Sequence, residues 1–225
     1  MKIFIASALA ASALSAFPAY AQGDGKPDLN AICAARACRT HFYDAVVRFD
    51  EKHYKTVPVT QTPYVLDDDS ILIFPGETLA ITFSIEDGKL AKPLFYKQYS
   101  AQLPAQIQID EKPAANPDNV SLPTIKGELN AEITANMPPN TLIFSYGQLN
   151  GQKDMILMVN GNAPKSVKLD AYIFLLSEKG YKETYTSTCP LRTGIGLFEH
   201  WPYPLGPIIL SHVRFMQAGE AMTCN

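Results

Sequence analysis

Alternation of apolar and polar side chains is clearest over residues 166–189, where it predicts a long antiparallel hairpin. In the first arm, a strand would place every second, apolar side chain on one face. These residues are Val167, Leu169, Ala171, Ile173 and Leu175. The opposite face becomes apolar only from Tyr172 onward, so this arm is expected to be half-buried at its start and buried on both faces at its end. Gly180 can adopt a positive φ, which favours a chain reversal over residues 177–180. The second arm, residues 181–189, is rich in Thr and Tyr and is typical of a half-exposed strand.

A second strong β pattern lies at residues 78–85. Leu79, Ile81, Phe83 and Ile85 fall on one predicted face, and smaller or polar residues fall on the other. The Pro-Gly pair at residues 75–76 predicts a turn before this strand, and the polar residues 86–89 predict one after it.

Shorter apolar runs, separated by turn residues, predict further strands. They lie at residues 42–49, 56–60, 71–74, 94–99, 125–134, 142–146, 155–160 and 208–215. Pro58 suits an edge strand better than a central one, because proline cannot donate a hydrogen bond to a neighbouring strand. Roughly eleven to thirteen short strands in all indicate a mostly β fold, an antiparallel β-sandwich that is Ig-like or jelly-roll-like.

The domain organisation depends on residues 102–124, which contain Pro104, Pro113, Pro117 and Pro123 and few large apolar residues. Such a composition predicts a long loop or a linker. We expect a single sandwich domain over residues 22–225 that contains this loop. The alternative is two small β domains, at residues 40–101 and 125–225.

Residues 1–21 have the pattern of a secretory signal peptide. Lys2 precedes an apolar run over residues 3–17, and Ala19-Tyr20-Ala21 matches a cleavage site. The apolar run is too short to span a bilayer. The chain is therefore predicted to be periplasmic or secreted, with no membrane span after the signal is removed.

The four cysteines of an exported chain are expected to form two disulfides, for which three connectivities are possible. We favour Cys33–Cys38 and Cys189–Cys224. Residues five apart on one helix point about 140° away from each other. A Cys33–Cys38 bridge therefore excludes a continuous helix from 33 to 38. Asp28 and the Ala-rich residues after it predict either a short helix or a tight disulfide loop.

Charge and motifs narrow the class of function. The chain has 19 Lys and Arg against 22 Asp and Glu, and its basic residues are scattered, which disfavours nucleic acid as a partner. The sequence lacks GxSxG, HExxH and GxxxxGK[ST] patterns. Gly194-Ile195-Gly196 lacks the third glycine of a dinucleotide site. We expect no cofactor and no metal, and a role in binding in preference to catalysis.

The candidate binding surface is residues 198–205, predicted as an aromatic loop stiffened by Pro202 and Pro204. It contains Glu199, His200, Trp201 and Tyr203, which could meet a protein or an envelope polysaccharide. The competing interpretation is that Trp201 packs beneath the loop as part of the core.

Two alternative functions stay open. One is a hydrolase acting on envelope material, with a site assembled from His200, His212 and Glu199. The other is a structural subunit that contributes an exposed sheet edge to an assembly.

Overall fold

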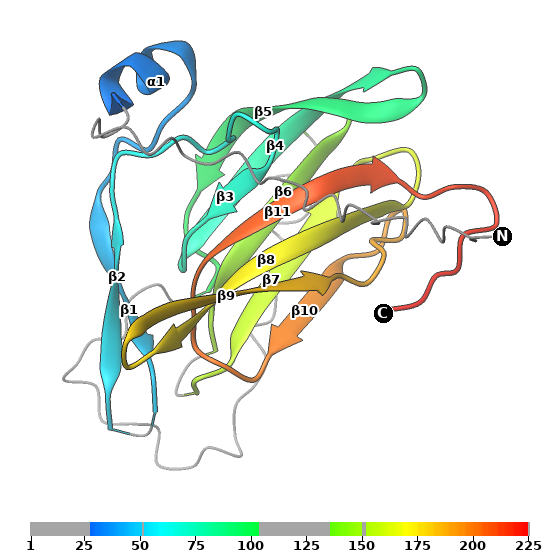
Figure 1. Cartoon of the computed structure of the whole chain (residues 1–225). Coiled ribbons are helices and arrows are strands. Elements are labelled where there is room, and N and C mark those ends of the chain that lie inside the picture. The colour runs from blue at the N-terminus through cyan, green and yellow to red at the C-terminus, as the bar shows by residue number, and fades with distance from the viewer. Residues whose placement is uncertain (1–27, 51, 104–135, 150–151, 225) are drawn as a thin grey trace, which may run out of the picture.

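The computed structural model describes residues 28–50, 52–103, 136–149 and 152–224. In these ranges the chain forms one short helix, α1, and eleven strands, β1 to β11 (Figure 1). The prediction of a mostly β protein is confirmed. The predicted signal peptide, the proline-rich segment from residue 104 onward and the predicted strand 125–134 lie outside the described residues, so those predictions stay predictions.

Nine of the strands form two antiparallel sheets. The five-stranded sheet has the order β10 (Leu197–Trp201), β7 (Met155–Gly161), β6 (Thr141–Gln148), β4 (Glu77–Glu86) and β5 (Lys89–Tyr99). The four-stranded sheet has the order β3 (Ile71–Ile73), β11 (Leu205–Phe215), β8 (Val167–Ser177) and β9 (Gly180–Ser187). The hairpin expected at residues 166–189 is the β8–β9 pair, and Gly180 has the positive φ that its turn requires.

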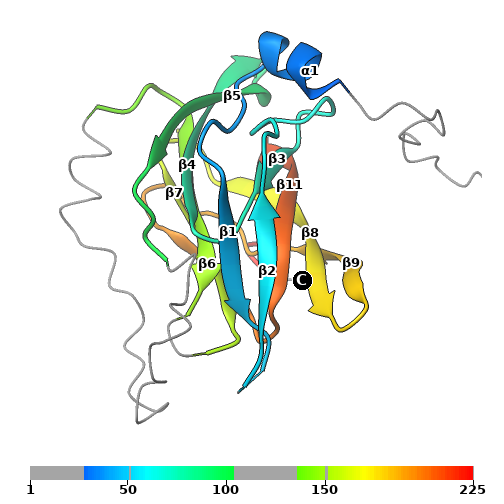
Figure 2. The same cartoon turned by 90° about the vertical axis from the view of Figure 1, so that its left-hand side faces the viewer.

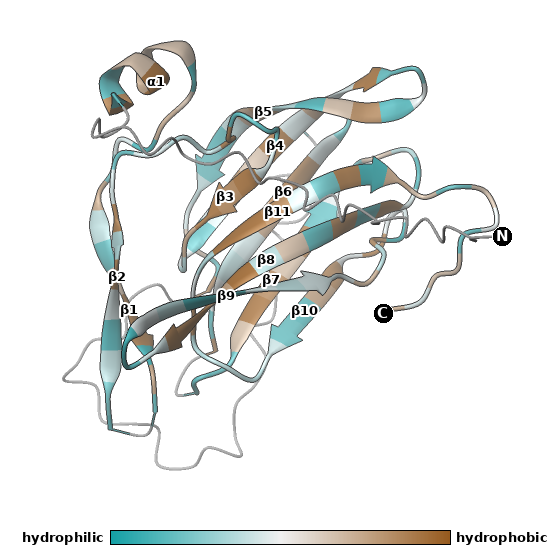
Figure 3. Ribbon diagram, viewed as in Figure 1, coloured by the Kyte–Doolittle hydropathy of each residue, from teal (hydrophilic) through white to brown (hydrophobic). Residues whose placement is uncertain are grey.

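The two sheets pack face to face (Figure 1), and hydrophobic residues recur along the strands of both (Figure 3). Their facing side chains form the core. Val167, Leu169 and Ala171 of β8 are at most 1% exposed, as are Leu142 and Phe144 of β6. Alternation along each strand supplies one apolar side chain to the interior at every second residue. The predicted antiparallel sandwich is thus present.

The β1–β2 hairpin covers one lateral opening between the sheets (Figure 2). Its strands are β1 (Tyr43–Arg48) and β2 (Tyr54–Val59), and the apolar residues that it adds to the core are Ala45, Val47, Val57 and Val59. The buried Gln148 side chain joins this hairpin to β6: it accepts from the Arg48 N–H at 2.7 Å and donates to the Arg48 carbonyl at 2.9 Å. Pro58 lies on an exposed position of this two-stranded unit, as expected for an edge strand.

Strand β4 departs from a simple buried and exposed alternation. Thr78 and Ala80, on its outer face, are at most 1% exposed. Tyr99 and Met137 pack against Ala80 and its neighbour Ile143, and the Gln102 N–H donates to the Thr78 hydroxyl. Ile85 is 45% exposed, since it lies beside the turn at the far end of the β4–β5 hairpin. Side-chain period predicts which face a residue occupies, but not what covers that face.

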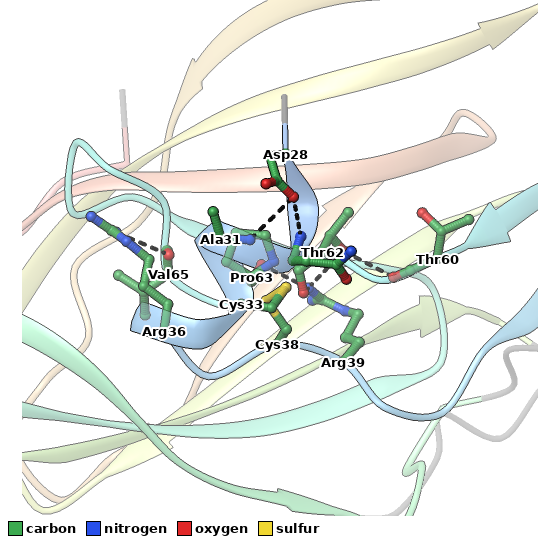
Figure 4. The surroundings of a disulfide bond; sticks show 11 residues. Asp28, Ala31, Cys33, Arg36, Cys38, Arg39, Thr60, Thr62, Pro63 and Val65 are labelled. Carbon is green, nitrogen blue, oxygen red and sulfur yellow. Dashed lines mark hydrogen bonds between the residues drawn. A yellow bond between two sulfur atoms is a disulfide. The ribbon is translucent and has the colours of Figure 1, made fainter. Parts of the chain in front are cut away.

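Both predicted disulfides are confirmed, and so is a short helix. Helix α1 (Leu29–Ala35) begins at Asp28, whose side chain accepts from the N–H groups of Asn30 and Ala31. It ends three residues before Cys38, and the Cys33–Cys38 bridge joins α1 to the chain beyond it with Cα atoms 5.4 Å apart (Figure 4). The helix and the bridge coexist because the helix is not continuous from 33 to 38.

Arg39, the residue after this bridge, forms a bidentate ion pair with Glu77 in the interior. Both side chains are only 1% exposed. Arg39 Nε donates to Glu77 Oε1 at 2.6 Å and Nη2 donates to Oε2 at 2.7 Å. Glu77 Oε2 also accepts from the Phe74 N–H at 2.8 Å.

Other donors of the Arg39 guanidinium bind backbone carbonyls on two further segments. Nη1 donates to the Pro63 carbonyl at 2.9 Å, and Nη2 donates to the Leu72 carbonyl at 2.7 Å. The aromatic rings of Tyr64 and Phe74 lie 4.5 and 4.8 Å from the guanidinium carbon. One side chain therefore connects the disulfide segment to the chain before β3, to β3 itself and to the start of β4.

Residues on both sides of 104–135 contribute to one buried cluster, which contains Leu79 and Ile81 from one side and Leu157 and Leu210 from the other. The division of the whole chain into one domain or two stays a prediction. Among the described residues, no helix is long and apolar enough to cross a membrane.

We predict that Arg39→Met lowers the free energy of unfolding by about 3–5 kcal/mol, because Glu77 then stays buried without a counter-charge. Urea denaturation measures the loss. Lys92→Met is the matched control: it breaks the Lys92–Glu86 pair, which is 2.6 Å long but has side chains 73% and 45% exposed. The control should keep a midpoint close to wild type. Equal losses in the two variants would contradict a structural role for the buried pair.

Candidate functional site

The segment predicted as an aromatic loop is a strand over its first part, and this changes where its side chains point. Residues 197–201 form β10, which pairs with β7 from Leu197↔Val159 to Trp201↔Met155. Consecutive residues of a strand lie on opposite faces. Leu197, Glu199 and Trp201 therefore lie on the inner face of the sheet, while Phe198 and His200 lie on the outer face. The prediction of a loop is therefore wrong for residues 198–201, because these residues pair regularly with β7.

Trp201 belongs to the core. It is 7% exposed, and its ring packs edge-to-face against Tyr146 with centroids 6.5 Å apart. Tyr203, just after the strand, is 54% exposed, and Phe198 on the outer face is 56% exposed. Trp201 thus presents no open ring to a ligand, and it does not share a surface with His200.

The side chains of Glu199 and His200 bond to different partners on opposite faces of β10. The Glu199 carboxylate accepts a hydrogen bond from the Cys189 N–H, and burial raises its pKa although that bond acts in the opposite direction. His200 Nε2 lies 2.8 Å from Asp154 Oδ2 on the other face. The two neighbours in sequence therefore cannot act on one ligand.

His212 lies on β11, in the other sheet, where its Nδ1 is 3.0 Å from Asp170 Oδ2. The structure does not bring His200, His212 and Glu199 together. Within the described part of the chain, no group of three or more His, Cys, Asp or Glu side chains is placed to hold a metal ion. Spacing along the chain cannot reveal this separation, because β10 and β11 adjoin in sequence but belong to different layers.

We predict that Glu199→Gln increases stability at neutral pH. A raised carboxyl pKa in the folded state means that stability is fully present below the ordinary glutamate pKa and falls as pH rises through the raised value. Glutamine keeps an acceptor for the Cys189 N–H but cannot ionise, so the decline should vanish. Thermal unfolding between pH 3 and about 8 measures it.

Glu178→Gln, at the exposed β8–β9 turn, controls for loss of a surface carboxylate. A wild-type decline that persists unchanged in Glu199→Gln would disprove the assignment.

A more continuous candidate surface is the outer face of the β8–β9 hairpin. We call it the aromatic face, and it consists of Tyr172, Phe174, Tyr181 and Tyr185. The strand register places Tyr172 directly opposite Tyr185, with ring centroids 5.4 Å apart and planes at 64°. Phe174 meets Tyr181 edge-to-face, at 6.4 Å and 90°. Tyr181 is 49% exposed and Tyr185 is 54% exposed.

Asp170 and His212 border the aromatic face. The ladder between β11 and β8 shifts register between Ser211 and Arg214, and His212 within this bulge has a φ of 50°. A bulge re-aims a side chain, and here the imidazole lies against Asp170. Desolvation raises the pKa of Tyr185, and the hydrogen bond and charge of the neighbouring Asp170 raise it further. The polar border is thus ordered by contacts within the chain.

The sequence contained part of the signal for this surface. The predicted half-exposed second arm is confirmed by the exposed Tyr181 and Tyr185. The prediction that the end of the first arm is buried on both faces is wrong, because Tyr172 and Phe174 stay partly accessible. Apolar character on both faces of a strand predicts burial of both, whereas here the second apolar face forms a surface cluster.

A pocket of about 280 Å³ between α1 and β5 is a weaker candidate. Ala34, Ala37, Val65 and Phe95 contribute to its lining. Arg36 at its border already donates to the Leu66 carbonyl at 2.7 Å and lies 2.6 Å from Asp67. The Arg36 guanidinium is therefore already bonded within the chain.

Comparisons with known proteins give no match: no protein-family model, no curated protein and no solved structure corresponds to this chain.

Proposed function

We propose that this chain is an exported binding protein that holds a protein partner against its aromatic face. The observation that supports this proposal most directly is the exposure of Tyr181 and Tyr185. They lie beside the partly buried Tyr172 and Phe174 on one face of the sheet. Tyrosine provides a large contact area and loses little side-chain entropy when it is fixed, which suits the centre of an interface.

The ring geometry favours a protein over a polysaccharide. Stacking on successive sugar rings needs aromatic faces that lie open and roughly parallel to the surface. Within the Tyr172–Tyr185 pair the ring planes stand at 64°, and within the Phe174–Tyr181 pair they stand at 90°. The two rings of a pair therefore cannot both lie parallel to the surface, and together they make it ridged. A ridged aromatic surface suits interdigitation with side chains of a protein.

Export is supported by the signal-like pattern of residues 1–21 and by two disulfides, because disulfides persist in oxidising compartments. Glu199, His200 and Trp201 do not form a shared ligand surface, because Glu199 and Trp201 lie on one face of β10 and His200 lies on the other. Tyr203 is exposed, but Trp201 beside it is buried.

A photo-activatable amino acid at position 185, in the full chain expressed in its own cells, should cross-link to a discrete protein. Tyr181→Ala in that background should reduce the yield by roughly tenfold or more, because a central tyrosine contributes about 2 kcal/mol. The measurement is the intensity of the cross-linked band after gel separation.

The same amino acid at position 198 is the matched control, since Phe198 is equally exposed but lies on the other sheet. Equal cross-linking from 185 and 198 would contradict the proposal. An adduct at 185 that resists protease and is removed by glycosidases would instead show a polysaccharide ligand, and would also overturn it.

A further inference from the structure

The sheet edges of this protein differ in how well they are protected against pairing with another strand. A strand edge presents unpaired backbone N–H and C=O groups, and proteins block it with short length, proline, lysine or bulges. At the edge of the five-stranded sheet, β5 has Pro93, three lysines, two register shifts and a positive φ at Lys92. Besides β5 and β9, the outer strands of the two larger sheets are β3 and β10, which have only three and five residues.

Strand β9 lacks most of these protections. It has eight residues, contains no proline, and pairs with β8 from Ser177↔Gly180 to Asp170↔Ser187 without a register shift. In the part of the chain that the structure describes, no strand pairs with its other side. The charge of Lys182 discourages nonspecific pairing with other strands. It does not cover the backbone N–H and C=O groups of β9 that point away from β8.

We propose that an extended strand of the partner protein adds antiparallel to β9, with its side chains against the aromatic face. This inference rests on the proposed function and names the form in which the partner binds. Backbone hydrogen bonds at a sheet edge supply affinity, and alternate side chains supply specificity. The aromatic face ends at this same edge, because Tyr181 and Tyr185 belong to β9 itself.

The side chains of β9 specify the chemistry of that strand. Tyr181, Glu183 and Tyr185 share the outer face, so directly opposite positions favour an apolar, a basic and an apolar residue. Lys182 and Thr184 lie on the other face, where an acidic residue and a threonine are complementary. Read antiparallel to β9, the partner pattern is apolar, Thr, basic, acidic, apolar.

The probe is a synthetic peptide with the core Val-Thr-Lys-Glu-Val, flanked by threonines. The matched control exchanges its two charges to Val-Thr-Glu-Lys-Val, which keeps composition and β-propensity but places like charges opposite Glu183 and Lys182. Titration followed by NMR of the full mature chain should show protection of β9 backbone amides. The first peptide should bind about tenfold more tightly, because two directly opposed charge pairs change sign.

A reciprocal variant makes the test specific. Lys182→Glu combined with Glu183→Lys alters only exposed positions, and it should reverse the order of the two peptides. Binding of neither peptide at millimolar concentration, or equal binding of both, would overturn strand addition. Protection of the β9 amides in the protein alone, rising with its concentration, would show a second copy at the edge and would also overturn it.

Failure here is distinguishable from failure of the proposed function. If peptides leave the β9 amides unchanged while cross-linking from position 185 persists and depends on Tyr181, the aromatic face binds its partner without strand addition. If cross-linking also fails, the proposed function itself is lost.

Discussion

The buried pair of Arg39 and Glu77 determines how the N-terminal part of this chain joins the sandwich. Two charges that are 1% exposed are tolerable only when nearly every donor and acceptor is bonded. That requirement fixes the chain beyond the Cys33–Cys38 bridge, the carbonyl groups around Pro63 and the turn before β4 in one arrangement. Helix α1 itself contributes no buried residue, so this segment is attached through the disulfide and through the contacts of Arg36 and Arg39. The β1–β2 hairpin follows directly after Arg39 and forms the lateral wall of the core.

Side-chain period allowed much of the fold to be predicted, because the strands bury one face each. The hairpin at residues 166–189, the strand at 78–85 and both disulfides could be predicted from local spacing and cysteine count. The Arg39–Glu77 pair could not, since its partners are 38 residues apart and neither residue stands out among other charged ones. The same holds for Gln148, which bonds to the backbone of a hairpin 100 residues away.

The candidate site was harder to predict than the fold. Trp201 is the single tryptophan and could be either a binding residue or a core residue. Which face of the sheet it occupies becomes clear only from the pairing of β10 with β7. The aromatic face depends on register: Tyr172 meets Tyr185 only because a two-residue turn sets the β8–β9 ladder. The open edge of β9 depends on strand order, which is a property of the whole sheet and is not visible in any local pattern.

The molecule combines a rigid junction at Arg39 and Glu77 with an open edge at β9. Native-state hydrogen exchange, resolved for single amides of the unliganded protein, tests this division most directly. The Phe74 amide, which donates to Glu77, should exchange only through global unfolding, while β9 amides directed away from β8 should exchange through local fluctuations many times faster. Protection of the β9 edge equal to that of Phe74, or rapid exchange at Phe74, would contradict this division.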